Sequence, residues 1–403
     1  MAKHKLHVQA RRRRTTALSA PPHAIWILYA RYGDGHRRAA MAVRAALHEL
    51  DPQLPLVALD YMGDVVPALD NIVRWSYTNM IKHVPNLWGW MYDRTEEIAT
   101  HSLLQTRVNH IGLRSLERAL QRYQPRAVIS TYPVCTGALG ELKELGRTNV
   151  PLVTVLTDYV MHTQWIHPGT DLYAVGAPEV AAGLIERGVD PGRIRVTGIP
   201  VQPSITRLPD TATARRQFGL DPDRPVILVM SGAYGVMGGT LEVCASLAKL
   251  DRPIQVVAVC GHNEALREEV TALAQESRVP ITALGYTRQA ELLMRASDLL
   301  ITKAGGLTVS EALAIGVPML IYLPIPGQEE FNTAYVVQHG AGEAVYSREQ
   351  LVERVVELID EDGQRKAMAE AARQIGHPRA AYDVANLALD LIEQRQLVAP
   401  REA

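Results

Sequence analysis

Short apolar runs of strand length recur throughout this chain and alternate with stretches of helical period. They lie at residues 25–30, 127–131, 152–157, 172–175 and 194–197, and again at residues 226–230, 254–260, 281–284, 299–302 and 319–322. Apolar strands that alternate with helices are typical of a parallel sheet covered on both faces. The pattern therefore predicts an α/β fold of two doubly wound, Rossmann-like domains, which face each other across a cleft.

The length of the chain agrees with two domains, because 403 residues exceed the usual size of one hydrophobic core. A proline-rich stretch marks a linker at residues 203–224. We expect a disordered basic tail at residues 1–22 and an N-terminal domain at residues 23–202. The C-terminal domain should occupy residues 225–403, and its last helices could pack back on the first domain. Parallel sheets bind ligands beyond the carboxyl ends of their strands, so the site should lie between the domains.

The composition argues against nucleic acid as a partner, because a net charge of -1 provides no basic field. Cys135, Cys244 and Cys260 are widely spaced in apolar surroundings, which indicates a reducing compartment and excludes a zinc site made of cysteines. No apolar run reaches the roughly 20 residues that span a bilayer. We expect a cytoplasmic protein that is peripheral on the inner face of the cell membrane, where its basic tail could meet anionic lipid.

The stretch at residues 303–342 carries the clearest indication of a ligand. A strand at residues 299–302 leads into a glycine pair and a helix predicted at residues 307–315. The free amides of Gly306, Leu307 and Thr308 at this helix start form an anion site that suits a phosphate. Glu311 lies one turn into the helix, where its carboxylate could accept hydrogen bonds from the hydroxyls of a ribose. Phosphate and ribose together indicate a nucleotide.

A second pair of polar residues follows the strand at residues 319–322. Prolines and a glycine stiffen a loop that should present Gln328 and Glu329, an amide and a carboxylate suited to sugar hydroxyls. A nucleotide joined to a sugar is a glycosyl donor, so the C-terminal domain is predicted to bind a nucleotide-sugar.

Further donor contacts are predicted at other strand ends of the same domain. Gly232, Tyr234 and Gly235 follow the strand at residues 226–230 and could contact the diphosphate or the sugar. Tyr286 closes another strand, and its ring could stack on the base.

In the N-terminal domain, Gly35 and His36 follow the first strand and begin a helix. The unperturbed pKa of histidine, near 6.5, suits removal of a proton from an alcohol, and the helix start should lower this pKa and keep the ring neutral. His36 is therefore the candidate catalytic base, opposite the donor site.

Three of the five tryptophans lie at residues 61–94, mixed with tyrosines and cations. Such a mixture favours the bilayer interface, where the rings are buried and their polar atoms stay wet. We expect Trp75 and Trp88 to line a groove for an acceptor beside the membrane. A helical pair packed on the domain is the alternative.

The motifs occur in the order seen in a known family. They are YGDGH, then TDYVMHTQWIHPG with VTGIPVQPS, and finally GGLTVSEALAIGVPM with PIPGQEEFN. Together they resemble the monogalactosyldiacylglycerol synthase and processive diacylglycerol glucosyltransferase family over residues 25–344. The resemblance implies a GT-B fold and an inverting transfer of a hexose from a UDP-sugar to diacylglycerol, without a metal or another cofactor.

The resemblance also implies roles for single residues. His36 would be the base and Glu311 would hold the ribose, while residues 306–308 hold the diphosphate and Gln328 with Glu329 hold the hexose. Asp158, His162 and Trp165 would lie near the acceptor. Plant members carry three glycines before the histidine, whereas this chain has YGDG, so galactose and glucose both stay open.

Three alternatives fit part of the pattern. A UDP-sugar 2-epimerase needs acids and bases around the sugar and no membrane groove, so the aromatic segment argues against it. The lipid-linked peptidoglycan N-acetylglucosaminyltransferase shares the reaction type, but TDYVMHTQW and PIPGQEEFN resemble it less well. A UDP-sugar sensor would keep Glu311 and Gln328 without needing a base at His36. The number of sugars added and the oligomeric state stay open.

Overall fold

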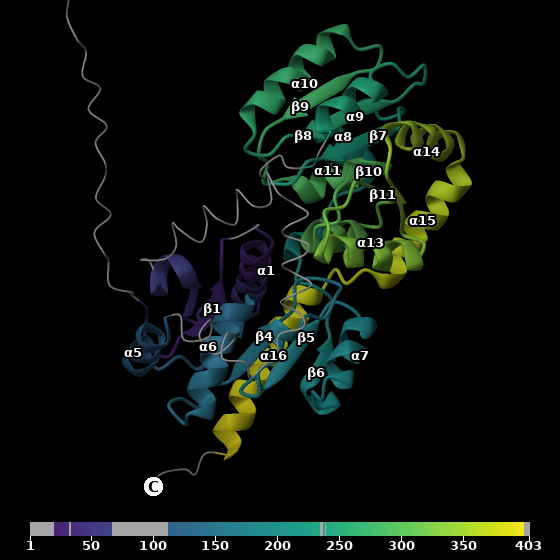
Figure 1. Ribbon diagram of the computed structural model, residues 1–403. Coiled ribbons are helices and arrows are strands. Elements are labelled where there is room, and N and C mark those ends of the chain that lie inside the picture. Colours follow the sequence, from purple (N-terminus) through teal and green to yellow (C-terminus); the bar gives the residue numbers. More distant parts are fainter. Residues whose placement is uncertain (1–19, 32–33, 67–111, 234–236, 238, 399–403) are drawn as a thin grey trace, which may run out of the picture.

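The computed structural model describes residues 20–31, 34–66, 112–233, 237 and 239–398. This part of the chain forms two parallel sheets of six strands each. Helices cover the sheets, as Figure 1 shows. The predicted α/β class with two doubly wound domains is confirmed. Trp75, Trp88, Tyr234, Gly235 and the first 19 residues of the predicted tail lie outside the described residues.

The N-terminal sheet has the strand order β2-β1-β3-β4-β5-β6. Its strands are β1 (Ile25–Tyr29), β2 (Leu56–Asp60), β3 (Ala127–Ser130), β4 (Leu152–Val155), β5 (Leu172–Val175) and β6 (Ile194–Val196). The helices of this domain are α1 (Gly35–Leu50), α5 (Leu113–Tyr123), α6 (Pro133–Glu144) and α7 (Pro178–Glu186), with short turns η1 (Tyr61–Val65), η2 (Thr163–Trp165) and η3 (Pro191–Arg193). Alternate residues of β1 enter two different cores, since Trp26 and Leu28 join one and Ile25 and Ile27 join the other.

The C-terminal sheet has the strand order β12-β11-β10-β7-β8-β9. Its strands are β7 (Val226–Met230), β8 (Gln255–Val259), β9 (Ile281–Leu284), β10 (Leu299–Thr302), β11 (Met319–Tyr322) and β12 (Gly342–Val345). The helices from here to the end of the chain are α9 (Thr240–Leu247), α10 (Glu264–Glu276), α11 (Ala290–Ala296), α12 (Gly306–Ile315), α13 (Gln328–Gln338), α14 (Arg348–Asp360), α15 (Asp362–Ile375) and α16 (Ala380–Val398).

Two strands of the sheets were not predicted from the sequence. These are β2 and β12, which lie at the edges of their sheets. An edge strand is covered less completely than a central one and can carry fewer apolar residues, which accounts for β12 but not for β2, whose sequence LVALD is apolar at its first four positions. In β12, for example, a glycine and a glutamate fill the first two of four positions.

The strand order of each sheet fixes where a ligand can bind. In the N-terminal sheet, β2 lies on one side of β1, and β3 to β6 follow on the other side. In the C-terminal sheet, β8 and β9 lie on one side of β7, and β10 to β12 follow on the other side. The strand order therefore changes direction between β1 and β3 and between β7 and β10. Open parallel sheets bind ligands outside the carboxyl ends of the strands at such a switch point. The loop before α1 and the loop before α12 follow β1 and β10, so the two predicted halves of the site lie at the two switch points.

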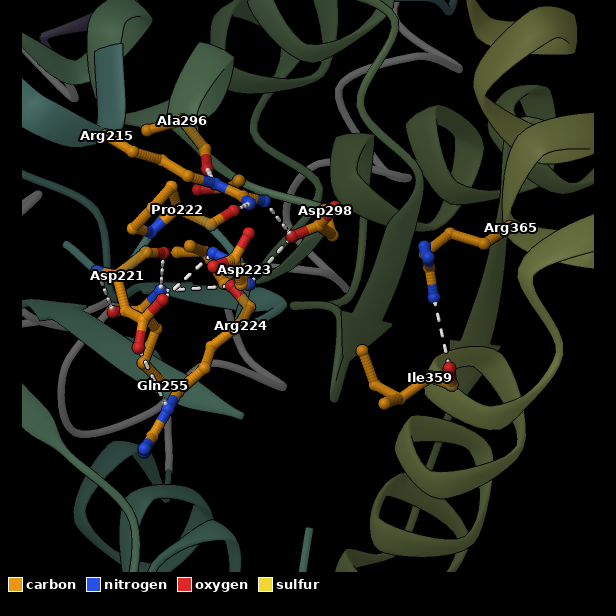
Figure 2. A network of polar contacts seen from close by, with 12 residues as sticks. Arg215, Asp221, Pro222, Asp223, Arg224, Gln255, Ala296, Asp298, Ile359 and Arg365 are labelled. Carbon is orange, nitrogen blue, oxygen red and sulfur yellow. Dashed lines mark hydrogen bonds and ion pairs between the residues drawn. The ribbon is translucent and has the colours of Figure 1, made fainter. Parts of the chain in front are cut away.

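The segment assigned to the linker contains the turn η4 (Pro203–Arg207) and the helix α8 (Thr211–Gln217), which packs against α11. Figure 2 shows how Arg215 of α8 is held, with an ion pair to Asp298 and a hydrogen bond to the carbonyl of Ala296 at 3.0 Å. Asp298 in turn accepts a hydrogen bond from the amide of Val226 at 2.7 Å. Arg215 therefore fastens the second half of this segment to the start of β7.

The last helix of the described residues packs on the N-terminal domain. Helix α16 runs beside α1 and beneath β4, as Figure 1 shows. Its residues Ala381, Val384, Ala385, Ala388 and Ile392 join the core that contains Ile25 and Ile27 of β1. No helix among the described residues is long and apolar enough to cross a membrane.

Candidate functional site

His36 is fixed at the start of α1 by contacts on several sides. Asp34, the residue before the helix, has φ 61 in the left-handed region and allows the sharp turn out of β1. His36 Nδ1 is hydrogen-bonded to Thr157 Oγ1 at 2.9 Å, and the His36 carbonyl accepts a bond from Thr131 Oγ1 at 2.9 Å. Burial lowers the pKa of His36 to about 4, so the ring is neutral near pH 7.

Trp165 contributes to the environment of His36, because the two ring centroids lie 6.3 Å apart. Trp165 is buried, at 5% exposure, at the end of η2. His162 stands just before this turn and accepts a hydrogen bond from the amide of Gln164 at 3.2 Å. The structure therefore gives His162 a capping contact, while Trp165 lies beside the candidate base.

Asp158 lies at the junction of the two domains. Its Oδ1 accepts a hydrogen bond from Asn332 Nδ2 in α13 at 3.1 Å, and the amide of Tyr159 donates to Asn332 Oδ1 at 2.8 Å. Burial raises the pKa of Asp158 to about 6, although the bond from Asn332 acts in the opposite direction. A carboxylate predicted near the acceptor thus also joins the domains.

Helix α12 begins at Gly306, one residue before the predicted start, and it abuts the N-terminal domain. A Cβ atom at Gly306 would lie 2.3 Å from the carbonyl oxygen of Thr157 and 2.9 Å from Asp158 Oδ1. Further along the helix, Ser310 Oγ is hydrogen-bonded to Tyr159 Oη at 2.9 Å. Only glycine fits at the first helical position. Leu307 and Thr308 follow it in the same first turn.

Glu311 is paired with a residue that the sequence did not indicate. It is buried, at 1% exposure, and its Oε1 accepts a hydrogen bond from Arg38 Nη2 of α1 at 2.5 Å. Arg38 also bonds to Glu291 of α11 at 3.0 Å. Burial and the neighbouring Glu291 raise the pKa of Glu311 to about 8, against the attraction of Arg38. The predicted ribose ligand is therefore a buried acid that contacts the other domain.

Gln328 and Glu329 do not lie in a loop, which corrects the prediction from the sequence. They form the first turn of α13, because Gly327, with φ 98, serves as the residue that caps this helix. Glu329 forms an ion pair with Lys303 through Oε1, and its Oε2 accepts a bond from the amide of Ile325 at 3.1 Å. The Oε1 atom of Gln328 is buried without a hydrogen-bond partner among the described residues.

The remaining predicted residues lie at other strand ends of the C-terminal domain. Gly232 has φ 79 in the loop after β7, as a tight turn requires. The Tyr286 ring, 39% exposed, stacks on His262 with centroids 4.3 Å apart and an interplanar angle of 7°. Gly35 opens α1 with no atom within 4 Å of the Cβ position. Tyr286 therefore already has one aromatic partner.

Four residues at this junction were missed by sequence reasoning: Arg38, Glu291, Lys303 and Asn332. Lys303 carried a local signal, since it is a cation next to the predicted anion site. The other three had none, because their partners lie on distant parts of the chain.

A family model described as monogalactosyldiacylglycerol (MGDG) synthase matches residues 36–201. A second model, described as glycosyltransferase family 28 C-terminal domain, matches residues 226–386. The first match begins at the candidate base, and the second covers all six strands of the C-terminal sheet.

Two solved structures share the fold. MurG from Acinetobacter baumannii superposes with a TM-score of 0.60 at 16% identity, covering 92% of this chain and 100% of that chain. A UDP-GlcNAc 2-epimerase from Neisseria meningitidis bound to UDP-GlcNAc gives a TM-score of 0.58 at 14% identity, with coverage of 91% and 100%. This common architecture is the GT-B fold, as predicted. At such low identity the likeness concerns the fold alone, and transferases and epimerases both adopt it.

Relatives in sequence are more informative. A protein named processive diacylglycerol beta-glucosyltransferase from Bacillus cytotoxicus is 30% identical over 366 residues, which cover 91% of this chain and 93% of the relative. A protein of the same name from Bacillus subtilis is 32% identical over 339 residues, with coverage of 84% and 87%. The chain therefore belongs to the monogalactosyldiacylglycerol synthase and processive diacylglycerol glucosyltransferase family.

Proposed function

We propose that this protein is an inverting glycosyltransferase that moves a hexose from a UDP-sugar to the hydroxyl of diacylglycerol. One observation in the structure carries the proposal. The side chain of Thr157 bonds to His36, and its carbonyl lies against Gly306, where the predicted phosphate site begins. A single residue thus joins the candidate base to the candidate donor site, as a direct transfer between the two domains requires.

The proposed reaction is one displacement. His36 takes the proton from the acceptor hydroxyl while that oxygen forms a bond to the anomeric carbon. The bond from this carbon to the diphosphate breaks, and its electron pair leaves with UDP. Attack from the face opposite the leaving group inverts the anomeric centre. Since Nδ1 of His36 is bonded to Thr157, we assign Nε2 as the nitrogen that accepts the proton from the acceptor hydroxyl.

The departing diphosphate gains negative charge during this step. The first amides of α12, at Gly306, Leu307 and Thr308, have no partner within the helix and carry the positive end of its dipole. Donors that are fixed before the reaction stabilise the growing charge more than the ground state. We therefore assign the diphosphate to the start of α12, and we expect transfer without a metal ion or another cofactor.

For the sugar, we propose glucose, because the two Bacillus relatives described above are named beta-glucosyltransferases. The match to the MGDG synthase model keeps galactose as the alternative donor sugar to be tested. We place the protein at the inner face of the cell membrane, where diacylglycerol and cytoplasmic UDP-sugars meet. Trp75, Trp88 and the basic tail at residues 1–22 are proposed to contact the lipid surface.

The test uses purified protein with diacylglycerol in anionic vesicles and either UDP-glucose or UDP-galactose. We expect a hexosyl-diacylglycerol from UDP-glucose and a much slower reaction with UDP-galactose. A glycolipid from UDP-galactose alone would overturn the proposed sugar. Epimerised nucleotide without any glycolipid would overturn the proposed reaction class and favour a 2-epimerase.

A further inference from the structure

We propose that Lys303 binds the diphosphate of the donor, and that Glu329 holds Lys303 until the donor arrives. The inference rests on the proposed function, since it places a nucleoside diphosphate at this end of the sheet. Lys303 would then be a catalytic residue, because its ammonium group would touch the phosphate that leaves.

The position of Lys303 supports this role. It follows β10 directly, at the switch point between β7 and β10. A Cβ atom at Gly232 would lie 3.2 Å from Lys303 Cε, and one at Gly305 would lie 4.0 Å from Lys303 Nζ. The ammonium group therefore lies between the loop after β7 and the start of α12. These are the two backbone segments expected to surround a diphosphate in such a fold.

The charges around Lys303 give a second reason. Lys303 forms an ion pair with Glu329, and its side chain keeps 20% exposure. Glu329 tends to raise the pKa of Asp158 and Lys303 tends to lower it, so both charges act electrostatically on Asp158. A diphosphate entering beside two carboxylates would be repelled unless a cation faced it. Lys303 is the cation that the structure provides at this point.

Unsatisfied acceptors on the same helices point to a ligand with hydroxyl groups. Glu311 Oε2, in α12, and Gln328 Oε1, at the start of α13, are buried without hydrogen-bond partners among the described residues. A buried polar atom without a hydrogen-bond partner lowers stability, and the hydroxyls of a ribose or a hexose, which can both donate and accept, would satisfy both atoms. Lys303 lies three residues before the start of α12, and Glu329 is the second residue of α13.

The ion pair of Lys303 with Glu329 also couples recognition of the diphosphate to recognition of the sugar. Phosphate oxygens compete with Glu329 for the three donors of the ammonium group. As Lys303 turns to the phosphate, an oxygen of Glu329 becomes available to a hydroxyl of the hexose. The sugar contact is then completed only when a diphosphate is present.

The test compares the binding of uridine, UDP and UDP-glucose by calorimetry in the full chain. A charge-assisted bond to phosphate corresponds to about 10- to 100-fold in affinity. We expect Lys303→Met to reduce the affinity ratio of UDP to uridine by that factor while leaving uridine binding unchanged. Lys303→Arg should keep most of the ratio. Lys249→Met, which changes an exposed lysine of the same domain, serves as the matched control.

Glu329→Gln separates the two parts of the inference. It should bind UDP at least as tightly as the unaltered protein, because Lys303 no longer has a competing partner, but it should lose added affinity for UDP-glucose. An unchanged ratio of UDP to uridine in Lys303→Met would overturn the role of Lys303 and leave the proposed function standing. Failure of the unaltered protein to bind either nucleotide would overturn both.

Discussion

Replacing Gly306 with alanine should push the two domains apart without unfolding either of them. The new Cβ atom would lie 2.3 Å from the backbone oxygen of Thr157, whereas ordinary contact begins at 3.4 Å. The neighbour is backbone and cannot rotate away, so the junction has to open by about 1 Å. The backbone conformation itself accepts alanine, because Gly306 is not among the glycines with a left-handed φ.

The magnitude follows from three of the hydrogen bonds that cross the junction, those made by Asp158 and Tyr159, which follow Thr157 in the chain. Tyr159 N to Asn332 Oδ1, Tyr159 Oη to Ser310 Oγ and Asn332 Nδ2 to Asp158 Oδ1 measure 2.8, 2.9 and 3.1 Å. A displacement of about 1 Å takes all three beyond hydrogen-bonding distance. At a net value of about 1 kcal/mol for each bond, closure weakens by about 3 kcal/mol, or roughly 100-fold in its equilibrium constant.

The assay measures kcat for transfer and the Kd of UDP in Gly306→Ala. We expect kcat to fall by about 10- to 100-fold while the Kd of UDP changes less than about threefold, because the amide at residue 306 is kept. Gly363→Ala, in the first turn of α15 with no atom within 4 Å of its Cβ position, is the matched control and should leave kcat unchanged. Normal kcat in Gly306→Ala would refute the reasoning that transfer depends on the close contact between Gly306 and Thr157.

Three further predictions concern the base, the buried carboxylate and the metal. His36→Ala should lower kcat by at least about 100-fold with UDP binding retained, and full turnover would remove His36 from the mechanism. Burial raises the pKa of Asp158 from its ordinary 3.8 to about 6, so the folded protein holds this proton more tightly and loses stability as the pH rises through that window. Asp158→Asn should remove up to about 3 kcal/mol of this pH-dependent loss in the free energy of unfolding. The measurement is urea unfolding of the variant and of the unaltered protein at pH 4 and pH 7. An identical pH dependence in both proteins would refute the assignment. Transfer should continue in a chelator, and activity restored only by added Mg²⁺ would show that the amides of α12 do not suffice.

The central strands could be predicted from the sequence because each is apolar along its whole length. The run IWILY of β1 is buried at every position, and the run VILVM of β7 is too. The edge strand β12 lacks such a run, and β2, although it begins with four apolar residues, is only half-buried at its first three positions. The start of α13 was missed for a different reason, since Pro324, Pro326 and Gly327 indicate a loop, whereas Gly327 caps the helix that Gln328 begins.

The site was predictable as far as it depends on strand ends. His36, Gly306 and Glu311 each follow a recognisable strand, so their position at the sheet edge could be inferred from local pattern. The partners could not be inferred, because Arg38 and Glu311 are 273 residues apart. Their contact depends on how the two domains pack, and no local pattern encodes that packing.

The central claim is that one displacement transfers a hexose to diacylglycerol with inversion. The direct measurement is the anomeric configuration of the lipid product by proton NMR, after reaction of diacylglycerol vesicles with UDP-glucose, whose sugar is α-linked. We predict a β-linked hexosyl-diacylglycerol. An α-linked product would contradict the single displacement by His36, and the absence of any glycosylated lipid, with UDP binding intact, would contradict the proposed acceptor.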